Sequence, residues 1–306
     1  MPDWDALIVG GGPAGLTAGL YLSRGNWKTL LLEKESVGGY IVNVEMIENY
    51  PGFSQGVAGA QLAMEMKNQA AKYGLRSQRG QVTVVQASPG SQRVACEDGN
   101  MYSARALVLA GGSVPKKLGV PGEEELLGSG VISCAFCDGS QFADKAVAVC
   151  GGGDAGVTEA LYLTKIASRV VLIEALPRLT ATAVLQERAK DEPKLEIRCG
   201  ERVTAIVGGG WVEGLEVVRD GEIETIKVDG VLVHVGLDPN TRYIDGVVKL
   251  DSGGGVVVNE WMETTAPGIF AAGDIRSNSA RQVAGAVGDG AIAGISANGF
   301  LQKMKA

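Results

Sequence analysis

The chain has 306 residues, with 28 basic and 35 acidic side chains that give a net charge of −7, and 45 glycines. Its length suggests about two domains, each large enough to bury its own core. No cluster of lysine and arginine is present, which argues against binding to nucleic acid or to an anionic membrane, because both need concentrated positive charge.

The first 36 residues predict a strand, a glycine turn, a helix and a second strand. In DALIVGGGPAGLTAGLYLSRGNWKTLLLEKES, the turn holds Gly10, Gly12 and Gly15, and the second strand ends at Glu33. In a dinucleotide-binding unit the first glycine makes the turn, the second lets the backbone approach a pyrophosphate, and the third lets the helix pack on the strand. The phosphate lies at the positive end of the helix dipole, and the acid binds a ribose hydroxyl.

A C-x-x-C pair follows a buried strand predicted in ARALVLAGGSVP (104–115). In ISCAFCDGSQF, the pair is Cys134 and Cys137, and Asp138 comes next. Such a pair can be half of a zinc site, a structural disulfide or a redox-active dithiol. Zinc takes four ligands and the only histidine, His234, is distant in sequence, so we expect no metal site. Five cysteines are an odd number, which argues against a disulfide framework.

A second glycine unit, AVAVCGGGDAGVTEALYLTKIASRVVLIEALP, directly follows the C-x-x-C segment. Its glycines are Gly151, Gly153 and Gly156, and its acid, Glu174, comes 23 positions after the first glycine, the same offset as in the first unit. Two ordinary strand-to-helix turns are the alternative, but matching strands, helices and acids favour two dinucleotide sites, one for a flavin and one for a nicotinamide.

The C-terminal segments predict a short strand in GIFAAGDIRS and a terminal helix in ARQVAGAVGDGAIAGISANGF. They have no unit of their own, so we expect them to complete the first domain. The predicted fold is α/β, with two Rossmann-like three-layer dinucleotide-binding domains, the second inserted in the first. Residues 1–114 plus 243–306 are predicted to form the first domain, and residues 115–242 the inserted second domain with the C-x-x-C; the resemblance described next implies that the first is an FAD-binding domain and the second a nicotinamide-type domain.

Together these motifs resemble the low-molecular-weight thioredoxin reductase family of FAD-dependent pyridine nucleotide-disulfide oxidoreductases. The resemblance also rests on GGYI, IENYPGF, LVLAGGSVPKKLGVPGE, VGLDPNT, PGIFAAGD and RQVAGAVGDG, in that order along the chain. It implies a homodimer in which Cys134 and Cys137 form a redox dithiol that reduces a thioredoxin-like protein disulfide. It also implies that Cys137 lies against the flavin and that Asp138 handles the proton, although Asp138 is also a common turn residue before glycine.

Further FAD contacts are implied by the resemblance alone. They are Gly38, Gly39, Asn49, Gly111, Asp274, Arg281 and Gln282. The N-terminal MPDWDALIVGGG lacks the features of a signal peptide, and no apolar run reaches the roughly 18 residues of a membrane span, so we expect a cytoplasmic protein.

One departure from the family concerns the electron donor. NADPH-dependent members follow the second strand of this unit with His-Arg-Arg-x-x-x-Arg, whereas this chain has Glu174-Ala175-Leu176-Pro177-Arg178-Leu179-Thr180. A carboxylate repels a 2′-phosphate and binds a free ribose diol, which predicts NADH rather than NADPH. IEALPRLTA also resembles the NADH-dependent alkyl hydroperoxide reductase flavoproteins. Arg178 remains as a cation that could meet a phosphate.

The sequence also fits alternative functions. The same change fits a nicotinamide-independent relative, either a ferredoxin-linked reductase or a flavin dithiol oxidase. Tyr40 and Ala280 replace the family's usual glutamine and tyrosine beside the flavin, which fits a retuned flavin environment or neutral drift. A non-enzymatic flavin redox sensor is a further alternative, although such a module has no need of an intact dithiol.

Overall fold

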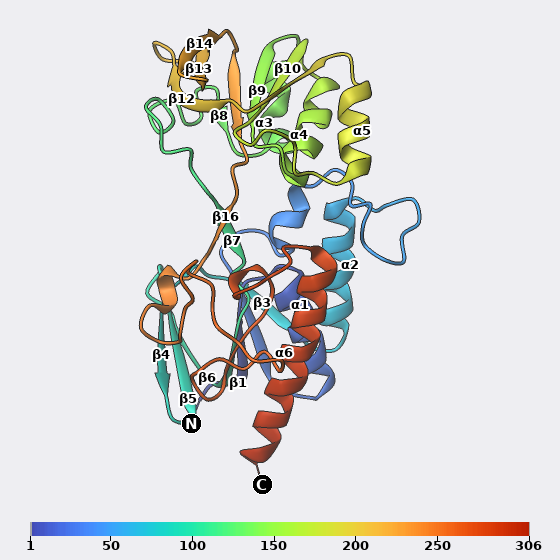
Figure 1. The fold of residues 1–306 in the computed structure, drawn as a ribbon. Coiled ribbons are helices and arrows are strands. Elements are labelled where there is room, and N and C mark those ends of the chain that lie inside the picture. Colours follow the sequence, from blue (N-terminus) through green and yellow to red (C-terminus); the bar gives the residue numbers. More distant parts are fainter. Residues whose placement is uncertain (1, 306) are drawn as a thin grey trace. The chain divides into compact units, whose positions relative to one another are not determined.

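The computed structural model describes residues 2–305, and the chain divides into two compact units. Unit 1 is Met1–Val114 with Asp238–Ala306, and unit 2 is Pro115–Leu237, so unit 2 is inserted in unit 1 (Figure 1). Both units are α/β and contain parallel sheets, in agreement with the predicted fold class.

The two connections between the units are the short paired strands β7 (Ser113–Pro115) and β16 (Leu237–Pro239). The sequence predicted a return to unit 1 at residue 243, but the chain returns at Asp238. The difference arises at Asn240. Its backbone N–H donates to the carbonyl of Gly112 at 3.0 Å, and this bond attaches the segment to unit 1.

The seven-stranded sheet of unit 1 is parallel on one side and antiparallel on the other. Its strands are β1 (Trp4–Val9), β2 (Thr29–Glu33), β3 (Arg76–Arg79), β4 (Val82–Ser88), β5 (Ser91–Cys96), β6 (Met101–Leu109) and β17 (Ile269–Ala271). The order is β3-β2-β1-β6-β5-β4, with β17 pairing only with β6. The first half of β6 pairs antiparallel with β5 and its last three residues pair parallel with β17. The C-terminal strand thereby completes the N-terminal sheet.

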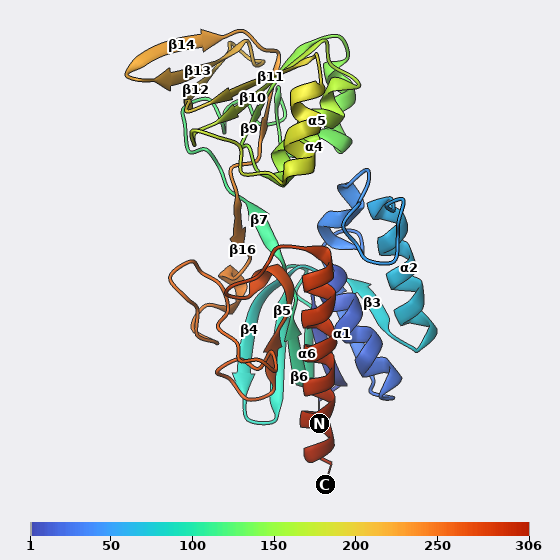
Figure 2. The same ribbon diagram turned by 45° about the vertical axis from the view of Figure 1, so that its right-hand side comes forward.

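Small residues allow two helices of unit 1 to pack side by side (Figures 1 and 2). The helices of this unit are α1 (Pro13–Arg24), α2 (Gly59–Lys72) and α6 (Val283–Lys303), with 3₁₀ turns η1 (Gly39–Asn43), η3 (Arg242–Ile244) and η4 (Gly273–Ile275). A Cβ on Gly290 would lie 2.3 Å from the carbonyl oxygen of Ala14, so α6 approaches α1 closely because it has glycine there. The predicted terminal helix is present, and it begins at Val283.

Unit 2 has three layers. Its strands are β8 (Val131–Ile132), β9 (Ala146–Cys150), β10 (Arg169–Glu174), β11 (Leu195–Cys199), β12 (Arg202–Val207), β13 (Gly214–Arg219), β14 (Glu222–Ile226) and β15 (Gly230–Val233). Its helices are α3 (Ala135–Asp138), α4 (Asp154–Thr164) and α5 (Ala183–Asp191), with the 3₁₀ turn η2 (Gly139–Phe142). The parallel sheet β11-β10-β9-β15-β8 has α4 and α5 on one face and the antiparallel sheet β12-β13-β14 on the other (Figure 2). Separate apolar clusters fill the two interfaces.

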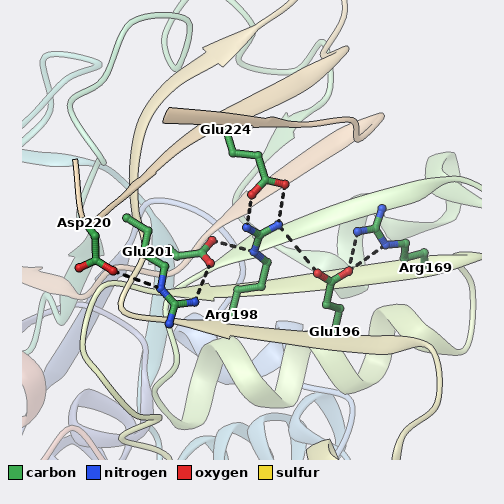
Figure 3. Close-up of polar contacts among 7 residues, drawn as sticks. Arg169, Glu196, Arg198, Glu201, Asp220 and Glu224 are labelled. Carbon is green, nitrogen blue, oxygen red and sulfur yellow. Dashed lines mark hydrogen bonds and ion pairs between the residues drawn. The ribbon is translucent and has the colours of Figure 1, made fainter. Parts of the chain in front are cut away.

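A network of ion pairs joins the parallel and antiparallel sheets of unit 2 (Figure 3). At its centre, Arg198 contacts Glu201 through Nε at 2.7 Å and also pairs with Glu224 on β14. Glu201 is only 2% exposed and lies 3.7 Å from Arg219 on β13. Arg169 pairs with Glu196 on β11. The three arginines of this network therefore all face carboxylates.

Candidate active site

The C-x-x-C pair forms a disulfide in unit 2. Cys134 is the N-cap of α3, and its sulfur accepts a hydrogen bond from the backbone N–H of Cys137 at 3.0 Å. Cys134 is buried, whereas Cys137 and Asp138 are exposed. Phe142, at the end of η2, is completely buried and packs against Gly230. The disulfide therefore presents one sulfur outward on a short segment that is anchored by a core aromatic residue.

The glycine turn of unit 1 has the geometry of a phosphate cradle. Gly10 has a φ of +104°, and a Cβ there would lie 2.2 Å from the carbonyl oxygen of Ala110, the residue that follows β6. A Cβ on Gly15 would lie 2.0 Å from the carbonyl oxygen of Gly10. A Cβ on Gly12 would have no other residue's atom closer than 3.9 Å, chain neighbours aside, and Gly12 caps α1 with extended backbone and no side-chain cap. The open space and uncapped helix N–H groups fit a pyrophosphate.

Glu33 holds this turn from the neighbouring strand. One carboxylate oxygen accepts the N–H of Gly11 at 2.7 Å and the other accepts the N–H of Glu35 at 2.9 Å. Each carboxylate oxygen has two lone pairs, so both oxygens retain acceptor capacity for ribose hydroxyls.

The other predicted FAD contacts form neighbouring pairs within unit 1. The N–H of Gly38 donates to the carbonyl of Gly11 at 2.8 Å, and a Cβ on Gly39 would lie 2.9 Å from the Cα of Gly12. The side-chain amide of Asn49 donates to Gln282 at 2.9 Å, which joins residues 233 positions apart. These contacts bring several of the predicted residues together.

The remaining predicted residues lie at the carboxyl ends of β6 and β17. Gly111 is next to the first glycine, since a Cβ on Gly10 would lie 3.0 Å from its Cα. Asp274 is in η4, directly after β17, and its carboxylate accepts a hydrogen bond from Ser279 at 3.0 Å. Burial raises the pKa of Asp274 above its usual range, despite the opposing effects of Ser279 and Arg281. Arg281 has a φ of +52°, an uncommon backbone conformation for a non-glycine residue.

The glycine turn of unit 2 repeats the first one closely. A Cβ on Gly151 would lie 2.1 Å from the carbonyl of His234, and one on Gly156 would lie 1.9 Å from the carbonyl of Gly151. A Cβ on Gly153, the N-cap of α4, would have no other residue's atom closer than 3.7 Å, chain neighbours aside. The first and third glycines are required by close packing, whereas the second leaves space for a ligand.

Glu174 occupies the same place in unit 2 as Glu33 in unit 1. Its carboxylate accepts the N–H of Gly152 at 2.6 Å and the N–H of Leu176 at 2.8 Å. Arg178, four residues further on, is exposed. The acid that replaces the family's first basic residue is therefore built into the turn.

Two half-buried polar residues near these sites, Glu159 and Tyr243, were not among the predicted site residues. Glu159 on α4 accepts the backbone N–H of Ala135 at 2.6 Å, next to Cys134. Tyr243 lies against Gly111 with its hydroxyl buried and unpartnered, and burial raises its pKa. Glu159 follows Gly156 by three residues, and this spacing places both on one face of a helix. That spacing was the signal in the sequence that could have added Glu159 to the predicted site.

Within residues 2–305, no helix is long and apolar enough to cross a membrane. The same residues hold no group of three or more histidine, cysteine or acidic side chains arranged to bind a metal ion.

Two glycine turns of one design and a disulfide define the class of protein, a dinucleotide-dependent disulfide oxidoreductase. The family model described as pyridine nucleotide-disulphide oxidoreductase matches residues 4–290. Thioredoxin reductase of Listeria monocytogenes is 40% identical over 99% of this chain and 95% of its own length. The Bacillus subtilis enzyme is 39% identical over 99% of this chain and 96% of its own length.

Solved structures agree with these matches. A crystal structure of Lactococcus lactis thioredoxin reductase has a TM-score of 0.95 at 35% identity and covers 98% of this chain and 100% of its own. That of the T. acidophilum enzyme has a TM-score of 0.93 at 34% identity, covering 98% and 99%. The chain belongs to the pyridine nucleotide-disulphide oxidoreductase family and has the fold of its low-molecular-weight thioredoxin reductases, which confirms the resemblance predicted from sequence.

Proposed function

We propose that this oxidoreductase passes electrons from NADH, through FAD bound in unit 1 and the Cys134/Cys137 dithiol, to a thioredoxin-like protein disulfide. The observation that carries this proposal is the disulfide, which lies in the same unit as a dinucleotide turn whose acid is Glu174. The relatives named above are thioredoxin reductases, which supports a thioredoxin-like protein as the partner.

FAD fits unit 1 because its glycine turn is open only where a pyrophosphate would lie. The residues that would hold it are Gly10, Gly12, Gly15, Glu33, Gly38, Gly39, Asn49, Gly111, Asp274, Arg281 and Gln282. Bound there, FAD would supply two-electron transfer between a nicotinamide hydride and a disulfide. The raised pKa of Asp274 suits a carboxyl group that meets a polar ligand rather than bulk water.

The nicotinamide site would use Gly151, Gly153, Gly156 and Glu174. NADH is favoured over NADPH because a 2′-phosphate would approach the Glu174 carboxylate and be repelled. Arg198, opposite Ile173 on the neighbouring strand, offers little compensation, since it is paired with Glu201 and Glu224 in the network of Figure 3. Arg178 is the exposed cation of the segment, and any attraction between it and a 2′-phosphate contributes to the donor preference that a titration measures.

At the dithiol, accessibility favours Cys137 as the sulfur that another group reaches first, because Cys134 is buried. Reduction of the disulfide consumes two electrons and two protons, breaks the sulfur–sulfur bond and leaves two thiols. Asp138 directly follows Cys137, lies exposed, and would donate or accept the proton. A homodimer and a cytoplasmic location complete the proposal.

An anaerobic titration tests the donor. Purified flavin-loaded protein is mixed with NADH and, separately, with NADPH, while the visible flavin absorbance is followed. We expect rapid bleaching by NADH and much slower bleaching by NADPH. Bleaching by neither would refute a nicotinamide donor and leave the ferredoxin-linked reductase or the flavin dithiol oxidase, which reduced ferredoxin and a dithiol substrate then separate.

A second experiment tests the dithiol. Cys137→Ser should abolish reduction of a thioredoxin disulfide and leave the flavin bound and reducible by the donor. Cys199→Ser is the matched control, because Cys199 is a free cysteine of the same unit. Surviving disulfide turnover in Cys137→Ser would show that the pair is not the relay. Loss of both the flavin and the turnover would point to a structural role.

A further inference from the structure

A half-buried carboxylate, that of Glu159, links the disulfide segment to the second glycine turn. Glu159 on α4 accepts the N–H of Ala135 through Oε2 at 2.6 Å, and Ala135 has no exposed surface. Its other oxygen, Oε1, lies 2.9 Å from Nε2 of His234. The side chains of Glu159 and His234 are 16% and 6% exposed, so water screens this contact weakly.

His234 fixes the other end of this bridge. Its backbone N–H donates at 2.8 Å to the carbonyl of Cys150, the last residue of β9, and its own carbonyl packs against Gly151. The Nε2 atom is buried and makes no aligned hydrogen bond, so it approaches Glu159 closely without forming a well-directed bond. Glu159 therefore lies between the dinucleotide turn and the residue that follows Cys134.

The disulfide segment needs such a support. α3 has only four residues, about one turn, and an isolated turn of helix is unstable because nucleation costs more than one hydrogen bond returns. Within the segment, the N–H of Cys137 is satisfied by the Cys134 sulfur, an acceptor that changes chemically on reduction. The Ala135–Glu159 bond does not involve sulfur and is independent of that change.

We propose that Glu159, held by His234, is a positioning residue that keeps the two cysteines close and lowers the reduction potential of their disulfide. This inference rests on the proposed role of the pair as a redox relay. Two effects act in the same direction. The tether favours the closed disulfide over the open dithiol, and the nearby carboxylate disfavours a thiolate. Reduction itself takes up two electrons and two protons and converts one disulfide into two thiols.

The test measures the disulfide directly. Flavin-loaded protein is equilibrated with dithiothreitol redox buffers, free thiols are alkylated, and the peptide that contains Cys134 and Cys137 is quantified by mass spectrometry. We expect Glu159→Ala to make the disulfide about tenfold easier to reduce, a potential about 30 mV less negative. Glu159→Gln keeps an acceptor for Ala135 and should shift the equilibrium about threefold. Glu187→Gln, the same change at an exposed site on α5, should leave it unchanged.

A Glu159→Ala equilibrium within twofold of the unchanged protein overturns the proposal, as does an equal shift in the Glu187→Gln control. If Glu159→Ala fails to fold, His234→Gln replaces it, with an expected shift of about threefold in the same direction and the same refuting outcome. The potential is measured without a nicotinamide or thioredoxin. A failed donor titration would therefore refute the proposed function while this measurement still decides the role of Glu159.

Discussion

Replacing the charge at Glu174 tests the donor assignment most directly. The carboxylate is 9% exposed and is fixed by two backbone N–H groups, those of Gly152 and Leu176. A 2′-phosphate in place of the ribose hydroxyl would lie within about 4–6 Å of it. Repulsion at that distance is of the order of 1–4 kcal/mol per pair of unit charges, between the limits of bulk water and a protein surface.

These energies translate into a specificity ratio. One factor of ten in kcat/KM corresponds to about 1.4 kcal/mol, so the unchanged protein should prefer NADH over NADPH by tenfold or more. Glu174→Gln removes the charge and keeps one acceptor oxygen for the turn. We expect this ratio to fall about tenfold, mainly through a lower KM for NADPH, because the lost repulsion acts on binding. The assay is steady-state disulfide reduction with each donor at low ionic strength, where the repulsion is screened least.

Glu33→Gln is the matched control, because Glu33 makes the same two backbone contacts in unit 1. It should weaken retention of FAD, measured by flavin absorbance after gel filtration, and leave the donor ratio unchanged. A donor ratio that stays within twofold in Glu174→Gln refutes the charge argument. So does a ratio that falls equally in Glu33→Gln, since the effect would then not belong to the second turn.

Two further predictions concern stability. Glu201→Ala removes a buried carboxylate of the network in Figure 3 and should lower the free energy of unfolding of unit 2 by about 3 kcal/mol, measured by chemical denaturation. Glu196→Ala removes an exposed carboxylate of the same network and should lower it by less than about 1 kcal/mol. Equal losses in the two variants would contradict the burial argument. Asp274→Asn should stabilise the flavin-free protein at neutral pH, because burial raises the pKa of this carboxyl and its ionised form opposes folding. The gain should be fully present above the raised pKa and vanish as the pH falls below the ordinary value of 3.8, and a gain that persists at lower pH would refute this cause.

The sequence predicted the two glycine turns well because their geometry requires glycine itself. A Cβ on Gly10 or Gly151 would collide with a neighbouring carbonyl, and both residues have positive φ. Such constraints act on single positions with fixed spacing, so they can be read without a structure. A Cβ on the second glycine of each turn would have no atom closer than 3.7 Å, so close packing does not require glycine there.

Contacts between distant residues could not be predicted in this way. The bond between Asn49 and Gln282 joins residues 233 positions apart, and the Glu159–His234 contact joins α4 to the end of β15. No local pattern encodes either contact, because each depends on how the sheet brings the elements together. The unit boundary at Asp238 has a related cause, since the hydrogen bond from Asn240 to Gly112 joins this segment to unit 1.

The two acids give the donor argument its structural basis. If Glu174 merely replaced a basic residue by drift, its carboxylate would have no reason to face the turn. Instead both of its oxygens accept backbone N–H groups, and Glu33 does the same in unit 1, with distances that differ by about 0.1 Å between the two turns. A histidine at this position could not accept two such bonds, because a neutral imidazole has one acceptor nitrogen. The second turn is therefore built around a carboxylate, as the first one is, and this arrangement suits a free ribose diol better than a phosphate.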